Sequence, residues 1–564
     1  MKMRNKLLKI IVLSIIVMTW FSGCNEDRLL DKYPKDEVVQ NVFMQGEATA
    51  RQAAIGCFQP LKQWEESYSS RFLHALEVGT DNEENKPTGQ IWRIQMNEWT
   101  FDATHSDNSI GMAFWWGMFY KTINNANYAI EYIPTAKDPK FTKEIQDKYI
   151  AIAQLLRAFS YMNLSIFWGN VPFHDKYTSD IENMVISQSK RSQVMELVIS
   201  DLIEATKNLP DKWTGENSGL PAKAAAAGLL ARAYLWAADF QLIDGETTPF
   251  TAAEYFQKAE IAADDAIIVA DLTGHSLMPD FLHMMSIDSQ QGHGNDNTEF
   301  IFTLNFLENS LTMPDDGSGN PNMGICERAC QENKGIIVYG TGRGAIFPSR
   351  DLYDAFEPGD RRRSFSMWAP GDFYGIYNGP TVTYTLSPQL GGGIKTVNAG
   401  DSVFYDYGWA NTNLTIRKIW APLKDLAQQR ESGYDLPLLR YAELLLMSAE
   451  AKIENNKIAE GMAQLNKVRA RPSVNMPPLT ASDQSDAREK LRHERRIELC
   501  LEGMRYYDLL RWDIVEEVMT HPIKVRFGYD NLKVVHGQFP KNKLWPIPQT
   551  EIDRNPLMKQ NPGY

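Results

Sequence analysis

The sequence predicts a mainly α-helical fold, in which tetratricopeptide-like helical hairpins carry long irregular insertions with short strands. Three observations support this prediction. Apolar side chains recur at helical spacing in one segment after another along the chain. The stretches from Ala224 to Tyr234 and from Tyr441 to Ala451 alternate small and aromatic residues as such repeats do, although no strict period is present. The segments between the helices include long stretches rich in Gly, Pro, Asn and Asp.

The helices are expected in a defined order. A polar tether at 27–41 leads into a first helix from Glu47 to Glu66. Three complete hairpins and one further helix follow from the apolar spacing. Their segments are Met112 to Ile133 with Lys143 to Phe167, Val194 to Leu209 with Ala222 to Ala238, Ala252 to Val269, and Leu438 to Glu454 with Ile458 to Ala470. The chain therefore repeats helical hairpins.

Three insertions interrupt this helical frame, at about 71–109, 271–349 and 368–435. The first has scattered aromatic residues and the polar run from Asp81 to Asn85, without a sustained period, so it is expected to form loops and short strands. Long irregular insertions on a regular frame usually carry function. We therefore look for the functional residues there.

Composition limits the classes of partner. Seventy-one acidic and fifty-eight basic side chains give a net charge of −13, which argues against a nucleic-acid partner. The run from Arg361 to Arg363 follows Asp360 and is expected to be solvated or ion-paired. Fourteen Trp and twenty-three Tyr are plentiful, and aromatic residues beyond those needed for a core tend to serve recognition surfaces.

The first residues have the pattern of a secretion signal. A basic start is followed by an almost wholly apolar stretch from Leu7 to Phe21, shorter than the roughly 20 residues that a spanning helix prefers. The small residues Ser22 and Gly23 then precede Cys24, as in the lipobox of bacterial lipoproteins. We expect residues 1–23 to be removed, Cys24 to be lipidated, and its acyl chains to anchor the protein in a membrane. Although the length of the chain would allow several domains, a single domain is expected at 24–564.

Motifs for catalysis and metal binding give no positive indication. The chain has no His-Glu-x-x-His zinc motif and no Gly-x-Ser-x-Gly nucleophile elbow. The glycines from Gly340 to Gly344 lack dinucleotide-binding spacing, and the run from Asp315 to Asn320 lacks the ligand pattern of an EF-hand, so both predict turns. No catalytic residue, metal or cofactor is predicted, although a structural calcium ion and a disulfide between Cys326 and Cys330 stay open. Unpaired or buried thiols are the favoured state of the cysteines.

The segment from Leu491 to Trp512 predicts a helix, its end and a second helix. An apolar face recurs at the spacing of one helix side, and Gly503 can take the left-handed conformation that ends a helix. The opposite side is charged, and Arg495 and Glu498 lie one turn apart, so they are expected to pair. The apolar face consists of Ile497, Cys500, Leu501 and Met504.

This segment also resembles a family signature. Arg495-Arg496-x-Glu498, followed by Glu502-Gly503-x-Arg505-x-x-Asp508-Leu509-x-Arg511-Trp512, is similar to the C-terminal motif of SusD/RagB-like nutrient-binding lipoproteins. The stretch from Tyr434 to Glu443 and the terminus from Leu544 to Tyr564 are typical of the same family. The resemblance implies a protein on the outer face of the outer membrane. There it would capture a glycan and deliver it to a SusC-type TonB-dependent transporter, without catalysis.

The ligand site is expected on two of the insertions. Trp92, Arg93 and Asn97 on the first, with Tyr339 and Arg343 on the second, combine rings that can stack on sugars with groups that can bind hydroxyls. By resemblance, starch-binding members use aromatic side chains from two similarly placed insertions. Three alternatives stay open: a peptide as the ligand, a surface glycoside hydrolase, and a structural scaffold that binds no ligand.

Overall fold

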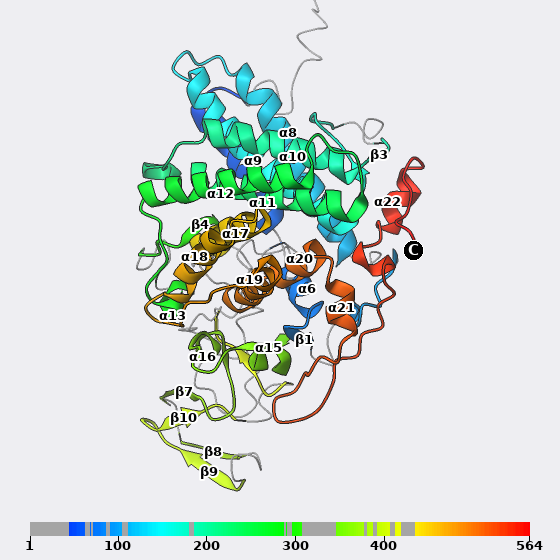
Figure 1. Cartoon of the computed structure of the whole chain (residues 1–564). Helices are drawn as coiled ribbons and strands as arrows, with labels where there is room; N and C mark the ends of the chain where they lie inside the picture. Colours follow the sequence, from blue (N-terminus) through cyan, green and yellow to red (C-terminus); the bar gives the residue numbers. More distant parts are fainter. Residues whose placement is uncertain are drawn as a thin grey trace, which may run out of the picture.

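A row of long helices forms the frame of the protein, as the computed structural model shows (Figure 1). The mainly helical fold predicted from the sequence is confirmed. The structure describes residues 44–62, 68, 72–85, 91–103, 111–179, 185–286, 289, 296–306, 346–376, 381–386, 392–406, 412–418 and 435–564. The long helices are α8 (Met112–Tyr132), α9 (Lys143–Trp168), α10 (Arg191–Asn208), α11 (Lys223–Asp244), α12 (Ala252–Leu272), α17 (Tyr441–Glu454) and α18 (Ile458–Arg469).

Consecutive helices of this row pack on one another, from α8 against α9 through to α17 against α18. The predicted helical segments are therefore confirmed, with ends that differ by a few residues. Close approach needs small side chains. A Cβ atom on Gly228 of α11 would lie 2.5 Å from Leu439 Cδ2 and 2.7 Å from Leu444 Cδ2, so a larger residue there would force these leucines to shift.

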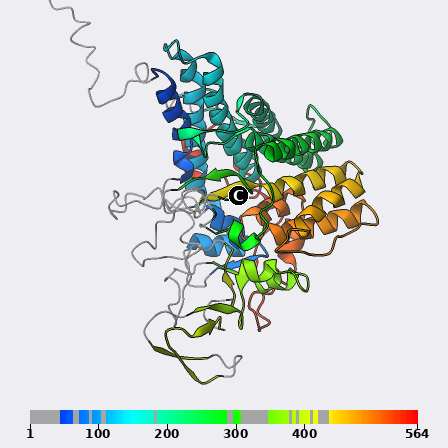
Figure 2. The ribbon, with the colours of Figure 1, turned by 90° about the vertical axis from the view of Figure 1, so that its left-hand side faces the viewer.

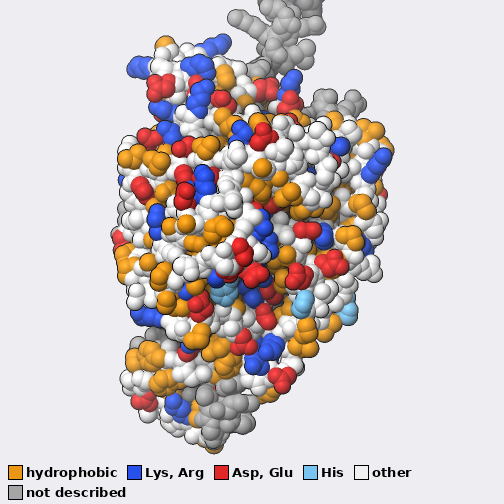
Figure 3. All heavy atoms as spheres, viewed as in Figure 1, with side chains coloured by type: hydrophobic (Ala, Val, Ile, Leu, Met, Phe, Trp, Pro, Cys, Tyr) orange, Lys and Arg blue, Asp and Glu red, His pale blue; other side chains and the backbone are white. Residues whose placement is uncertain are grey.

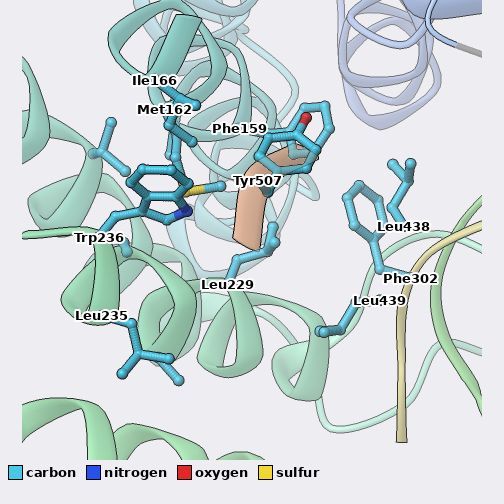
Figure 4. Packing of buried hydrophobic residues seen from close by; sticks show 14 of the residues in the cluster. Phe159, Met162, Ile166, Leu229, Leu235, Trp236, Phe302, Leu438, Leu439 and Tyr507 are labelled. Carbon is cyan, nitrogen blue, oxygen red and sulfur yellow. The ribbon is translucent and has the colours of Figure 1, made fainter. Parts of the chain in front are cut away.

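A single large cluster of buried apolar side chains runs through the frame. In Figure 4, Phe159, Met162 and Ile166 of α9 lie among Leu229, Leu235 and Trp236 of α11 and Tyr507, which comes from α20 (Met504–Arg511). Among the described helices, α9 is the one long and apolar enough to cross a membrane, but 89% of its most apolar window is buried inside the fold. Its hydrophobicity is therefore used in the core.

Most of the shorter helices lie on one side of the row, below α17 and α18 in Figure 1, and Figure 2 shows this arrangement turned by 90°. They are α4 (Glu47–Gly56), α5 (Gln59–Lys62), α6 (Leu73–Val78), α7 (Ile91–Glu98), α13 (Phe281–Met284), α15 (Arg350–Ala355), α16 (Arg362–Ser366), α19 (Gln484–Glu498), α20, α21 (Val515–Thr520) and α22 (Gln549–Arg554). Short 3-10 helices lie at Ile133–Thr135, Gly215–Asn217 and Lys541–Lys543.

The strands form antiparallel pairs, each a two-stranded sheet. Two pairs matter for the site, because they join distant segments of the chain. They are β1 (Glu83–Asn85) with β5 (Ile346–Pro348), and β4 (Phe300–Leu304) with β12 (Leu436–Arg440). The other pairs are β2 (Val171–Pro172) with β3 (Gln188–Ser189), β6 (Met367–Trp368) with β11 (Thr415–Ile416), β7 (Phe373–Ile376) with β10 (Ser402–Phe404), and β8 (Val382–Thr385) with β9 (Ile394–Val397).

Three predicted elements need correction. The first predicted helix divides into α4 and α5, and the segment at 436–440 is strand β12 because it pairs with β4 before α17 begins. The first insertion is more regular than predicted, since α6 and α7 flank β1 there. These helices are too short for their period to stand out from the sequence.

The predicted helix, turn and helix at 491–512 are present as α19 and α20. The first helix ends at Glu498, and Gly503, with φ +81°, lies in the left-handed conformation directly before α20. Cys500 and Leu501 therefore follow the helix, although both are buried as predicted. The break is thus a turn of several residues rather than a single glycine.

Several predictions concern residues outside the described part of the chain: the leader at 1–23, Cys24, the turns at 315–320 and 340–344, and the pair Cys326 and Cys330. Of the described cysteines, Cys57 and Cys500 are buried free thiols. On the face shown in Figure 3, basic and acidic side chains are interspersed.

Candidate functional site

The site begins with a buried ion network around Glu498, at the end of α19. Arg440 and Arg471 each place a guanidinium nitrogen 2.8 Å from Glu498 Oε1, and Arg362 lies 3.0 Å from Oε2. Burial would raise the pKa of Glu498, but Arg471, Arg440 and Arg362 hold it well below its usual value. The signature residues thus bind three arginines from separate segments into one network, which we call the signature network.

The predicted pairing of Arg495 with Glu498 is wrong. Arg495 instead donates to Asp508 of α20, with Nη2 2.9 Å from Oδ1, while Glu498 is occupied by the signature network. Both side chains are buried rather than on a charged outer face. A buried ion in a protein needs partners that fully surround it, and here those partners come from distant parts of the sequence.

The same signature holds the first insertion in place. Arg505 of α20 donates two hydrogen bonds of 2.8 Å to the carboxylate of Asp81, and Arg496 of α19 lies 2.9 Å from it. Arg496 Nε also donates to Asn82 Oδ1 at 2.9 Å. The loop before β1 is therefore fixed to α19 and α20, which positions the polar residues that follow.

Four polar side chains lie on α7, on β1 and directly before β1; we call Asn82, Glu84, Asn85 and Asn97 the polar cluster. Three of them are buried, and Glu84 is half-buried. Asn97 Nδ2 donates to Glu84 Oε1 at 2.8 Å. Within the described residues, Asn82 Nδ2, Glu84 Oε2, Asn85 Oδ1 and Asn97 Oδ1 are buried without a hydrogen-bond partner. Such a group costs free energy unless water or a ligand binds it, so each one needs an explanation, and a functional site is one such explanation.

A buried lysine, Lys533, binds the backbone of the loop that leads into β1. Lys533 Nζ donates to the carbonyl oxygens of Val78, Thr80 and Glu83 at 2.6, 2.7 and 3.0 Å. Burial lowers the pKa of Lys533 and raises that of Glu84, while the two charges partly offset these shifts. The arrangement provides a carboxylate and amide groups, which suit hydrogen bonding to hydroxyl groups.

The structure brings together part of the predicted site. Asn97, Arg93 and Trp92 all lie on α7, so the premise that they belong to a loop is wrong. Asn97 joins the polar cluster, whereas the Trp92 ring is only 4% exposed and packs edge-on against Trp115, at a centroid distance of 5.8 Å. Arg93 lies over the Trp92 ring, at 5.1 Å. A stacking role for Trp92 would require this ring to become exposed, and the role stays a prediction.

The other two predicted residues, Tyr339 and Arg343, lie outside the described residues. The strand that follows them does pair with the first insertion, because Ile346 of β5 lies opposite Asn85 of β1. The two insertions thus meet at the polar cluster. Sequence reasoning missed Glu84, Asn85 and Lys533, although the run from Asp81 to Asn85 was a usable signal.

Comparison with known proteins places the chain in a family. A model described as the SusD family matches residues 283–564, and one described as starch-binding associating with outer membrane matches residues 39–235. The chain therefore belongs to the SusD family, as the signature predicted. The SusD-like protein P2 of Formosa agariphila is 27% identical over 570 residues, which cover 98% of each chain.

Solved structures agree in fold. A SusD homolog from Bacteroides thetaiotaomicron has a TM-score of 0.72 at 22% identity, covering 94% of this chain and 99% of that one. A SusD-like carbohydrate binding protein from Bacteroides fragilis has a TM-score of 0.71 at 21% identity, covering 92% and 100%. These solved structures therefore share the fold of this chain.

Proposed function

We propose that this protein is a cell-surface lipoprotein that binds an oligosaccharide at the outer membrane and delivers it to a SusC-type TonB-dependent transporter. Membership in the SusD family supports this, as does the description of one matching model as starch-binding associating with outer membrane. The Bacteroides fragilis relative is itself described as a carbohydrate binding protein. Binding without catalysis is the role that follows.

The observation that carries the proposal is the polar cluster. Its unfilled groups are one amide donor and three oxygen acceptors, on or beside the loop that Arg496, Arg505 and Lys533 hold in place. A sugar hydroxyl can donate to one such group and accept from another, so vicinal hydroxyls suit this set. Ring contacts from Trp92 and Tyr339, with Arg93 and Arg343 beside them, stay part of the proposal.

The test is a binding screen of purified protein against soluble glycans, with variants of the polar cluster. Asn97→Ala removes an amide that would bind hydroxyls, so the affinity for the selected glycan is expected to fall about tenfold. Asn531→Ala is the control, because Asn531 is an exposed amide whose side chain makes no hydrogen bond to the described residues. Equal affinities of the two variants would place the glycan elsewhere.

The screen also separates the alternatives. Binding of peptides but not glycans would favour peptide uptake, and release of shorter products from a bound glycan would favour a hydrolase. If no ligand binds, the scaffold alternative gains and the proposal fails. Delivery is tested separately, by asking whether a large β-barrel protein copurifies after extraction in mild detergent.

A further inference from the structure

A cavity of about 30 Å³ lies inside the helical frame, where α19 and α20 pack near α9, α11 and α17. We call it the internal cavity. A water molecule needs roughly 10 to 15 Å³ of such space, so this volume suits one or two waters and is far too small for a sugar or a peptide. The residues of the polar cluster lie outside its wall. The internal cavity is therefore separate from the candidate glycan site.

The wall of the internal cavity has an apolar part and a polar part. Figure 4 shows side chains of the apolar part, where Met162 and Ile166 of α9 and Trp236 of α11 lie in the same cluster as Tyr507. A small space with apolar walls alone stays dry, whereas a polar wall holds water. The polar part is formed mainly by charged side chains, which are Arg232, Glu443, Arg495, Glu502, Asp508 and Arg511.

One of these charged side chains has a donor that no described residue accepts. Arg495 is 2% exposed and donates from Nε and Nη2 to the carboxylate of Asp508, at 3.0 and 2.9 Å. Its Nη1 is buried and makes no hydrogen bond within the described part of the chain. Asp508 occupies one edge of the planar guanidinium, so Nη1 lies on another edge of a side chain that lines the internal cavity. A buried N–H of this kind needs an acceptor.

The carboxylates of the wall can bind the same molecule from the other side. Glu443 lies 2.8 Å from Arg232, and Glu502 lies 2.8 Å from Arg440. Each carboxylate oxygen has more than one acceptor position, so these ion pairs leave room for a further hydrogen bond. The wall could therefore accept from a molecule that itself accepts from Arg495.

The charges of the wall decide between a neutral molecule and an ion. Three arginines face three carboxylates there, so the wall carries no surplus charge of either sign. A chloride ion or a metal cation would add a buried charge without a counter-ion, which costs several kcal/mol. A neutral molecule that both donates and accepts hydrogen bonds fits better, and at this volume it is water.

We infer that the internal cavity binds one or two water molecules, one of which accepts a hydrogen bond from Arg495 Nη1 and donates to carboxylates of the wall. A buried water usually makes about three hydrogen bonds, and this position provides them. Arg495 and Asp508 both belong to the sequence signature. The bound water is thus a structural part of the signature region, and it does not depend on the proposed function.

The first test is a high-resolution crystal structure of the full chain, from crystals in which bromide replaces chloride. A water peak is expected at hydrogen-bonding distance from Arg495 Nη1, roughly 2.7 to 3.2 Å, without an anomalous signal from bromide. The inference is overturned if no density lies there, if a protein atom bonds Nη1 instead, or if bromide occupies the position.

A pair of methionine substitutions tests the same binding in solution. Met504 lines the internal cavity and is half-buried, so Met504→Phe adds volume there without replacing a fully buried residue. Met476 lies outside the wall, and Met476→Phe is the matched control. Oxygen-17 relaxation dispersion counts long-lived bound waters, and it should find one or two fewer in Met504→Phe and an unchanged number in the control. Equal numbers in two folded variants would overturn the inference, and the crystal test decides it if Met504→Phe fails to fold.

Discussion

Glu498 binds three arginines that lie far apart in the sequence, so its carboxylate holds separate segments of the chain together. Arg362, Arg440 and Arg471 surround it, and Arg440 also bonds Glu502 at 2.8 Å. Such a network adds little stability compared with apolar residues of the same shape, but the loss of one member leaves buried charges without partners. The network therefore determines which segments pack together. This structural role accounts for the charged residues of the signature.

Replacing Glu498 with Gln is expected to destabilise the protein by about 3 to 5 kcal/mol, because three buried guanidinium groups lose their shared counter-ion. Urea unfolding of the two proteins measures the difference. Since the folded-state pKa of Glu498 is depressed, its contribution is present above the ordinary pKa of Glu and is lost as the pH falls below it. Glu489→Gln, at an exposed position on the same helix, should change stability little, and a similar loss there would contradict the argument.

The turn between α19 and α20 shows how one element depends on the packing of another. Gly503 has φ +81°, and its N–H donates to Glu77 Oε1 of α6. A Cβ atom at Gly503 would lie 2.5 Å from Leu73 Cδ1, also on α6. The glycine is thus required twice, by its backbone conformation and by the close approach of α6.

Gly503→Ala is therefore expected to cost more than a glycine substitution that meets conformational strain alone. Gly400, with φ +95° and no atom within 4 Å of its added Cβ, provides that comparison. Gly400→Ala should cost about 1 kcal/mol, and Gly503→Ala about 1 to 3 kcal/mol more because it overpacks Leu73. Thermal unfolding of the two variants measures this difference. Equal melting temperatures would show that α6 moves aside freely.

The elements could be predicted where a long segment carries its own period, as in α8, α9 and α12. They could not be predicted where pairing with a distant segment of the same chain determines the structure. The residues from Leu438 to Arg440 were expected to begin a helix, but they belong to a strand because they pair with β4. In the same way α7 is too short to show a face, so Trp92 was expected at a loop surface although its ring packs against Trp115.

The candidate site, like the fold, could be predicted only in part, because it too depends on contacts between distant segments. Two separate insertions were expected to contribute, and the pairing of β1 with β5 brings them together at the polar cluster. The choice of side chains within the first insertion was less accurate. Asn97 was included, but Glu84 and Asn85 were not, because their burial beside α7 depends on Arg505 and Lys533, which lie more than four hundred residues away in the chain.

At the scale of the whole molecule, the frame and the signature network act together as a rigid support for the insertions. The signature network links α19 to α16 and β12, and the bonds from Arg505 and Arg496 continue this support to Asp81. Such rigidity would favour ligand binding, because a site that is already ordered loses less conformational entropy when it binds.

The last prediction concerns how the whole molecule is held at the membrane. If Cys24 carries the acyl chains, Cys24→Ala should move the protein from the membrane fraction to the soluble fraction, since stable anchoring needs the lipid rather than any described surface. Fractionation after a carbonate wash, followed by immunoblotting, measures the partition. Ser14→Ala changes the apolar leader but keeps the cysteine, so this control should stay with the membrane. Unchanged partition of Cys24→Ala would mean that a contact other than the lipid holds the protein in the membrane fraction, and would contradict the predicted anchor.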